Sequence, residues 1–158
     1  MSESFDRMLD LARAALARAH APYSRFRVGA CVRAASGRLY AGANVENASY
    51  PVGQCAESNA IGAMVTAGER VIVEVVLVTE RATPCSPCGG CRQQLFEFAG
   101  ADTPIHLCGP EGLRTTLSLG QLLPLAFGTD SMGGPEMAPQ PPPTLGEAPA
   151  EPGRPSMI

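Results

Sequence analysis

The chain has 158 residues, of which 45% are hydrophobic and 17% are charged, and its formal net charge is −3. This length is ample for one domain and short for two. The apolar share and the small net charge exclude a fully disordered chain. All 12 basic residues are arginines and they are outnumbered by the acids, so the composition argues against a protein that binds nucleic acid.

No segment of the sequence predicts a membrane span or a secretion signal. The longest apolar run, over 71–78, is interrupted by Glu74 and is far shorter than a spanning helix. The first residues carry acids where a signal peptide would carry basic residues. We therefore expect a cytoplasmic protein with no membrane partner, in which the six cysteines do not form a disulfide framework.

The end of the chain differs in kind from the rest. Residues 131–158 hold 8 of the 15 prolines and no aromatic residue. Such a segment buries too little apolar surface to offset the entropy that is lost on ordering. We expect one folded domain over 1–130, followed by a proline-rich flexible tail over 131–158. A ligand for a proline-binding groove is the alternative interpretation of that tail.

The first half of the domain predicts a helix and a hairpin. Apolar residues follow helical spacing over 4–20, and Pro22 ends this helix. Two strand-like runs follow, over 28–35 and 38–44, and the Ser-Gly pair between them is typical of a hairpin turn.

The second half alternates between helices and strands. In chain order we expect a helix over 55–67, a strand over 71–79, a helix over 89–99, a strand over 104–108 and a helical turn over 120–123. The strand over 71–79 is a nearly continuous run of β-branched residues, as in strands that are covered on both faces. The order predicts an α/β fold of three layers, α-β-α, with a mixed central sheet.

Three cysteines and one glutamate form the candidate reaction centre. Cys55 and Glu57 open one predicted helix, and Cys88 and Cys91 open another. Three thiolates can hold a zinc ion and leave its fourth position open for water, which is the catalytic pattern rather than the structural one. Helix N-termini stabilise thiolates. Glu57 is placed to act as a proton shuttle without binding the metal.

The set of zinc ligands has alternatives. Cys85 and Cys88 form a second Cys-x-x-Cys pair, and the cysteines of 85–91 together with Cys55 could close a structural site of four thiolates. We favour Cys88 with Cys91, because the two glycines between them allow the backbone to approach a metal closely. A Cys-x-x-Cys pair alone is more often a structural zinc site or a redox pair.

The other cysteines and the histidines have plainer interpretations. Cys31 and Cys108 lie in predicted strands, where we expect small buried hydrophobic residues. His20 and His106 have no metal-like spacing to other candidates, so we expect structural or exposed side chains.

Five segments of the sequence resemble the small, three-cysteine cytidine deaminases. They are 22–30 (PYSRFRVGA), 44–51 (NVENASYP), 55–57 (CAE), 87–93 (PCGGCRQ) and 122–128 (LLPLAFG). The segments occur in the family's order and together cover the domain over 1–130, whereas the tail lies outside the match.

The resemblance implies a cytidine deaminase-like fold and a zinc-dependent hydrolytic deamination. In the family's chemistry, zinc held by Cys55, Cys88 and Cys91 activates a water that attacks C4 of the pyrimidine, and Glu57 carries the proton. Cytidine or deoxycytidine then becomes uridine or deoxyuridine, a step of pyrimidine salvage. The implied cofactor is Zn²⁺, and the implied partner is a small-molecule nucleoside.

Four positions match family residues that bind the nucleoside. Asn44 and Glu46 match the pair that holds the ribose hydroxyls, since an amide and a carboxylate together donate and accept hydrogen bonds. Phe26 matches the aromatic residue that packs near the pyrimidine, and the Ala56 backbone matches the group that reads the base edge. From spacing alone, Asn44 could equally be a turn residue and Phe26 a core residue.

Two aromatic positions imply an assembly. Tyr50 matches a substrate-site position near the subunit contacts. Phe127 matches an aromatic residue that reaches the pocket of a neighbouring subunit, which implies a homotetramer. From spacing alone, Phe127 could also be a core residue.

One position departs from the family pattern. The family often has arginine directly after Cys-Ala-Glu, where this chain has Ser58. Three thiolates on Zn²⁺ leave a net negative charge, which a nearby guanidinium can offset. Here the offset must come from the helix N-termini, the Ser58 hydroxyl or another arginine such as Arg92. We hypothesise that this zinc site is less electropositive than in relatives that carry the arginine.

Two other functions remain as alternatives. A related deaminase could act on another aminopyrimidine, such as a nucleoside antibiotic of the blasticidin type, although Asn44 and Glu46 favour cytidine. A structural zinc module could instead bind partners through the proline-rich tail, but such a site has no use for Glu57. An enzyme that edits polynucleotides needs a basic groove and usually has a histidine ligand.

Overall fold

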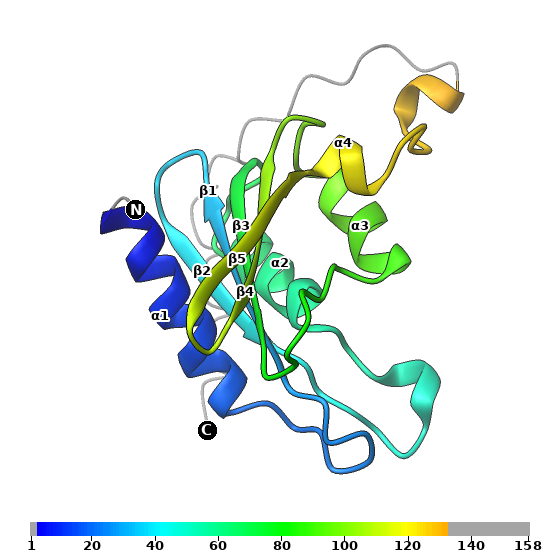
Figure 1. The fold of residues 1–158 in the computed structure, drawn as a ribbon. Helices are drawn as coiled ribbons and strands as arrows, with labels where there is room; N and C mark the ends of the chain where they lie inside the picture. Colours follow the sequence, from blue (N-terminus) through cyan, green and yellow to red (C-terminus); the bar gives the residue numbers. More distant parts are fainter. Residues whose placement is uncertain (1–2, 133–158) are drawn as a thin grey trace, which may run out of the picture.

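The computed structural model describes residues 3–132, which form a five-stranded sheet covered by helices (Figure 1). The helical elements are α1 (Glu3–Ala17), α2 (Ala56–Thr66), α3 (Gly89–Phe96), α4 (Leu119–Leu122) and the 3-10 turns η1 (Tyr50–Val52) and η2 (Thr129–Met132). The strands are β1 (Val28–Ala34), β2 (Leu39–Ala43), β3 (Ile72–Thr79), β4 (Pro104–Gly109) and β5 (Gly112–Ser118).

The sheet is mixed, as the sequence predicts. Its strand order is β2-β1-β3-β4-β5. The β1 strand is antiparallel to both of its neighbours, β3 and β4 are parallel, and β4 and β5 are antiparallel. Figure 1 shows α1 on one face of the sheet and α2 and α3 on the other. The expected three-layer α-β-α fold is therefore confirmed.

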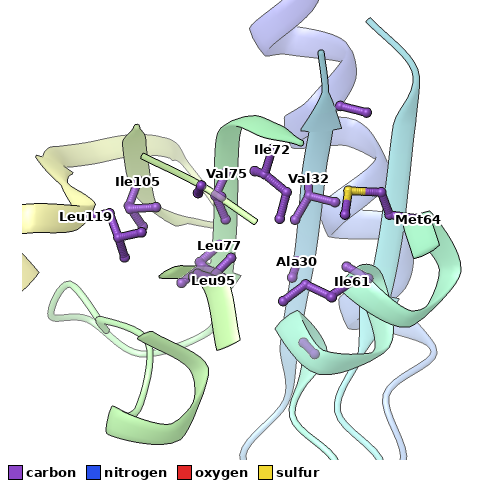
Figure 2. Close-up of a cluster of buried hydrophobic side chains, with 14 of the residues drawn as sticks. Ala30, Val32, Ile61, Met64, Ile72, Val75, Leu77, Leu95, Ile105 and Leu119 are labelled. Atoms are coloured by element: carbon purple, nitrogen blue, oxygen red, sulfur yellow. The ribbon is translucent and has the colours of Figure 1, made fainter. Parts of the chain in front are cut away.

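Each face of the sheet buries its own apolar cluster, and β3 contributes to both. Successive side chains of a strand point to opposite faces. Val75 and Leu77 lie in the cluster shared with α2 and with Leu95 of α3 (Figure 2). Val76 and Val78 lie in the cluster shared with α1. The strand is covered on both faces, which explains its nearly continuous apolar sequence.

Two helices end three residues before their predicted boundaries. After α1, the chain leaves the helix because the His20 N–H donates to the Asn44 carbonyl at 3.0 Å. After α3, the Phe98 carbonyl accepts the Ile72 N–H at 2.8 Å. In both places a long-range backbone pairing replaces the last helical turn, and local periodicity does not report such a pairing.

The sequence does not predict β5. This strand lies at the edge of the sheet, where only its first residue is buried, so its apolar signal is weak. Gly112 begins the strand with a φ of 132° and forms the tight turn from β4. An L-residue rarely adopts that conformation, so glycine is required there.

The close approach of α2 to β2 depends on Gly42. A Cβ atom at this position would overlap the backbone of Ala56 and Ala60. Because glycine has no side chain, the first turns of α2 can lie directly against the strand. This contact sets the place of Cys55 and Glu57 relative to the sheet.

The predicted tail over 131–158 begins within η2, and from residue 133 onward it lies outside the described residues. Within residues 3–132, no helix combines the length and the apolar character that a membrane span requires.

Candidate active site

The three cysteines of the favoured zinc set lie together at the N-terminal ends of two helices. Cys55 is the N-cap of α2, Cys88 is the N-cap of α3, and Cys91 lies in the first turn of α3. Their sulfur atoms all lie within 4.8 Å of one another, and the Cys55 and Cys88 sulfurs are 3.9 Å apart. The two helices are distant in sequence, so the tertiary fold builds this cluster.

The sulfur spacing fits a tetrahedral zinc ion. Zn–S bonds of about 2.3 Å at tetrahedral angles place sulfurs about 3.8 Å apart. A hydrogen bond from the Cys91 thiol lowers the pKa of Cys55 to about 6. The same contact, together with burial, raises the pKa of Cys91. The cluster therefore offers a thiolate near neutral pH, and the N–H groups of the two helix ends stabilise it.

Cys85 lies apart from this cluster. In the described part of the chain, the grouped sulfurs are those of Cys55, Cys88 and Cys91 alone. The Cys85 thiol donates instead to the Ser86 carbonyl at 3.7 Å, and burial raises its pKa. The geometry therefore favours the pair Cys88 and Cys91 over the pair Cys85 and Cys88, and an open site over one closed by four thiolates.

Glu57 lies in the first turn of α2, next to the capping Cys55. Only 4% of the residue is exposed. Burial raises the pKa of its carboxyl, and hydrogen bonds from its own backbone N–H and from the Cys91 thiol oppose that rise. A carboxyl with a raised pKa holds a proton more tightly than an exposed glutamate does, which suits a group that takes up a proton and later passes it on.

The Ser58 and Arg92 side chains are occupied away from the sulfurs. The Ser58 hydroxyl donates to the Gln94 side chain at 2.6 Å and so links α2 to α3. The Arg92 guanidinium donates to the Leu122 carbonyl and to two oxygen atoms of residues 86–87. Of the three expected sources of charge compensation, the helix N-termini are therefore the one that lies at the cluster.

A cavity of about 520 Å³ lies beside the cysteines, a volume within the range of small-molecule sites. Its wall contains most of the sequence-predicted site residues: Phe26, Asn44, Glu46, Tyr50, Ala56 and Glu57. The cavity formed by residues 3–132 does not include Phe127, which is 61% exposed. One chain thus brings together every predicted substrate residue except Phe127.

Asn44 also has a structural role at the cavity wall. Its side-chain amide donates to the Phe26 carbonyl at 2.9 Å, and its side-chain oxygen accepts the Val28 N–H at 2.8 Å. These two bonds fix the start of β1. One N–H and one lone pair of the amide remain for a ligand.

Glu46 holds the loop that precedes β1. Its carboxylate accepts hydrogen bonds from the Tyr23 N–H at 2.9 Å, the Ser24 N–H at 3.2 Å and the Ser24 hydroxyl. The Ser24 hydroxyl contributes most to lowering the pKa of Glu46. The carboxylate is therefore ionised and, with about four lone-pair directions, can still accept a further hydroxyl.

Aromatic side chains surround the cavity wall. The Arg81 guanidinium lies 5.3 Å from the centre of the Phe26 ring, a cation–π arrangement that holds the ring in place. The Tyr23 and Tyr50 rings lie 6.0 Å apart at an angle of 58°. Both tyrosines are exposed, so they mark the mouth of the cavity.

Sequence reasoning missed part of the cavity wall. Tyr23, Ser24, Leu77 and Thr79 also line the cavity. Tyr23 and Ser24 lie within the segment 22–30 that resembles the family, but their spacing alone does not predict contact with a ligand. For β3, the one available signal is the polar Thr79 at the end of an apolar run.

The remaining cysteines and histidines behave as expected from the sequence. Cys31 and Cys108 are buried in strands, and burial raises their pKa to about 12 and about 11. The His106 ring lies 3.0 Å from the Glu74 carboxylate and 2.8 Å from the Thr116 hydroxyl. These residues form part of the α1 side of the sheet and not of the cavity.

Comparisons with known proteins bear on this site. The model of the cytidine and deoxycytidylate deaminase zinc-binding region matches residues 2–107. A cytidine deaminase of Halalkalibacterium halodurans is 40% identical over 114 residues, which are 72% of this chain and 86% of the relative. One of Mycobacterium tuberculosis is 40% identical over 119 residues, which are 75% of this chain and 85% of the relative.

Solved structures of cytidine deaminases share the fold. One from Burkholderia pseudomallei has a TM-score of 0.73 at 37% identity and covers 80% of this chain and 100% of its own. One from Mycobacterium tuberculosis has a TM-score of 0.69 at 37% identity and covers 80% of this chain and 99% of its own. The chain therefore belongs to the family of cytidine and deoxycytidylate deaminases with a zinc-binding region.

Proposed function

We propose that this zinc-dependent cytidine deaminase acts on free cytidine and deoxycytidine, with Glu57 as its proton carrier. The observation that supports this most directly is the cluster of three sulfurs beside one buried carboxyl in a cavity wall. A structural zinc site needs neither the open position nor the acid. We place the reaction in pyrimidine salvage in the cytoplasm.

We assign Cys55, Cys88 and Cys91 as the zinc ligands. When bound there, zinc supplies Lewis acidity at an open fourth position. The carboxylate of Glu57 accepts one proton from the attacking water and delivers it to N3 of the pyrimidine. It then takes the remaining proton of that oxygen and delivers it to the amino group, so that ammonia leaves and C4 keeps a carbonyl. Its burial supports this role, because a raised pKa lets one group serve as base and then as acid.

The nucleoside fills the cavity with its base toward the buried end. The free capacity of the Asn44 amide and the Glu46 carboxylate suits the ribose hydroxyls. The Phe26 ring, held by Arg81, packs against the pyrimidine. The Ala56 backbone, which is buried beside Glu57, reads the polar edge of the base.

We propose a homotetramer in which Tyr50 and Phe127 contribute to subunit contacts. Tyr50 is 75% exposed and Phe127 is 61% exposed, and Leu125 is fully exposed. Coverage by a neighbouring subunit would remove these exposed apolar side chains from water. Light scattering on the purified protein tests the assembly, and a mass other than that of four 16.4 kDa chains contradicts it.

We assign the catalytic domain to 1–130 and a proline-rich tail without a catalytic role to 131–158. The acidic balance of the chain supports a nucleoside rather than a nucleic acid as partner. Deletion of residues 133–158 should leave kcat/KM for cytidine and the oligomeric state unchanged. Loss of either one contradicts this assignment.

The test of the function is an absorbance assay of cytidine loss. The wild-type protein, loaded with zinc, should convert cytidine and deoxycytidine to the uracil nucleosides. The Glu57→Gln variant should keep its zinc and lose turnover by about 10³-fold or more. A zinc-loaded wild type that leaves both nucleosides unchanged would exclude the proposal.

A further inference from the structure

The hydroxyl of Thr79 lies buried without a hydrogen-bond partner. Thr79 ends β3, the residue is 2% exposed, and its Oγ1 atom has no partner among the residues that the structure describes. Most buried hydroxyls in proteins are paired, because an unpaired one loses its bonds to water and gains none. An unpaired buried hydroxyl is therefore uncommon, and the one on Thr79 can accept a partner that the described residues do not provide.

Thr79 faces the same side of the sheet as the candidate reaction centre. It follows Val75 and Leu77 at alternate positions of β3, and those two residues lie in the cluster shared with α2 and α3 (Figure 2). Both Leu77 and Thr79 line the cavity. The β3 strand thus runs from the apolar core into the cavity wall, and its last residue is polar.

Burial locates Thr79 at the floor of the cavity. The most deeply buried residues of the cavity wall are Ala56, Glu57, Leu77 and Thr79, all at most 4% exposed. The exposed wall residues, such as Tyr50, lie at the mouth. A base that reaches the buried end of the cavity therefore enters the part whose wall includes Thr79.

The unpaired hydroxyl destabilises the folded protein in the rotamer observed. Packing at this position does not require a hydroxyl. Valine has nearly the same shape and would leave no polar atom unpaired. The Oγ1 atom exposes less than 1 Å² in the rotamer observed. A rotation of χ1 by about 120°, from one staggered position to the next, exchanges the places of the Cβ substituents and can turn the hydroxyl toward the cavity.

We propose that Thr79 is a substrate-binding residue whose hydroxyl bonds to the polar edge of the pyrimidine. This inference rests on the proposed function, since it requires a base at the floor of the cavity. A hydroxyl both donates and accepts, so Thr79 can bond to the amino group of the substrate and to the carbonyl of the product. The bond gives the hydroxyl a partner that the described residues do not supply.

Tyr40 supplies a matched control. Its hydroxyl is also buried without a partner within residues 3–132, but Tyr40 lies on β2 and packs against the core cluster rather than the cavity. Thr79→Val and Tyr40→Phe each remove one unpaired hydroxyl with little change of shape. Thr79→Ser keeps the hydroxyl and removes a methyl group.

The experiment measures melting temperature and cytidine kinetics for the zinc-loaded wild type and these three variants. Thr79→Val and Tyr40→Phe should each raise the melting temperature by about 3 °C. Thr79→Val should lower kcat/KM about tenfold, mainly through KM. Tyr40→Phe should leave kcat/KM unchanged, and Thr79→Ser should stay within about threefold of wild type.

Each contrary outcome has its own meaning. Unchanged kinetics for Thr79→Val, in a wild type that deaminates cytidine, overturn the inference and leave the proposed function intact. If Thr79→Val loses only kcat and its pH profile shifts, the hydroxyl acts on Glu57 rather than on the base. That result also overturns the inference. A wild type without turnover overturns both the function and the inference.

Discussion

The sulfur of Cys55 lies 3.9 Å from the sulfur of Cys88, and each residue is the N-cap of its helix. A cap position is normally occupied by a side chain that accepts N–H groups of the first turn. Here neither cysteine side chain makes a capping bond. Both sulfurs therefore belong to residues at the positive ends of the helix dipoles, which favours thiolate over thiol.

Replacing Cys91 should remove the metal, whereas replacing Cys85 should not. Cys91→Ser leaves two of the three clustered sulfurs, and the purified variant should hold little zinc and show no turnover. Cys85→Ser is the matched control within the same loop, and it should keep about one zinc per chain. Elemental analysis of the variants measures this. Zinc loss in Cys85→Ser would show that the wrong Cys-x-x-Cys pair has been assigned.

An arginine at position 58 should strengthen zinc binding. Ser58 donates to Gln94 and carries no charge, so Ser58→Arg adds a cation beside three thiolates. We expect zinc transfer to a chelator to slow by about tenfold and the pH–rate profile to shift. Ser58→Ala removes the Gln94 bond without adding charge and serves as the control. If both the zinc transfer and the pH profile of Ser58→Arg match wild type, the charge argument is wrong.

Two glycine-to-alanine changes should have opposite effects on stability. Gly42→Ala places a Cβ atom against the α2 backbone, and we expect a loss of about 1–3 kcal/mol in the free energy of unfolding. Gly62→Ala lies on the exposed face of α2 with no atom within 4 Å of the new Cβ, and it should add about 1 kcal/mol. Urea unfolding measures both. Equal stabilities would contradict the close packing of α2 on β2.

The buried carboxyl of Glu57 should make stability depend on pH. Its pKa is raised in the folded state, chiefly by burial, so the folded state binds this proton more tightly than the unfolded state does. The stability it contributes is complete below the ordinary carboxyl pKa and is lost as pH rises through the folded value. In chelator-treated protein, wild type should therefore lose stability relative to Glu57→Gln as the pH rises above the ordinary carboxyl pKa of about 4.3. Parallel pH curves for the two proteins would contradict the burial argument.

The fold was largely predictable because its strongest patterns are local. The apolar run of β3 and the helical spacing of α1 are both long enough to identify from sequence. The β5 strand was not predictable, since an edge strand buries few side chains. The early ends of α1 and α3 depend on backbone bonds to distant residues, such as the bond from His20 to Asn44.

The candidate site was predictable as far as its motifs reach. The pattern around Cys55, Glu57 and Cys88 predicts a catalytic zinc site with a proton shuttle. Two Cys-x-x-Cys pairs are compatible with that pattern. The positions of the sulfurs in space distinguish Cys91 from Cys85. Thr79 has no motif, and its unpaired hydroxyl becomes visible only when its three-dimensional surroundings are known.

An open zinc site with three sulfur ligands can be measured by X-ray absorption at the zinc edge of the purified protein. We expect three sulfur neighbours at about 2.3 Å and one lighter oxygen or nitrogen neighbour. A shell of four sulfurs, unchanged in Glu57→Gln, would show a closed structural site in which zinc has no position for water.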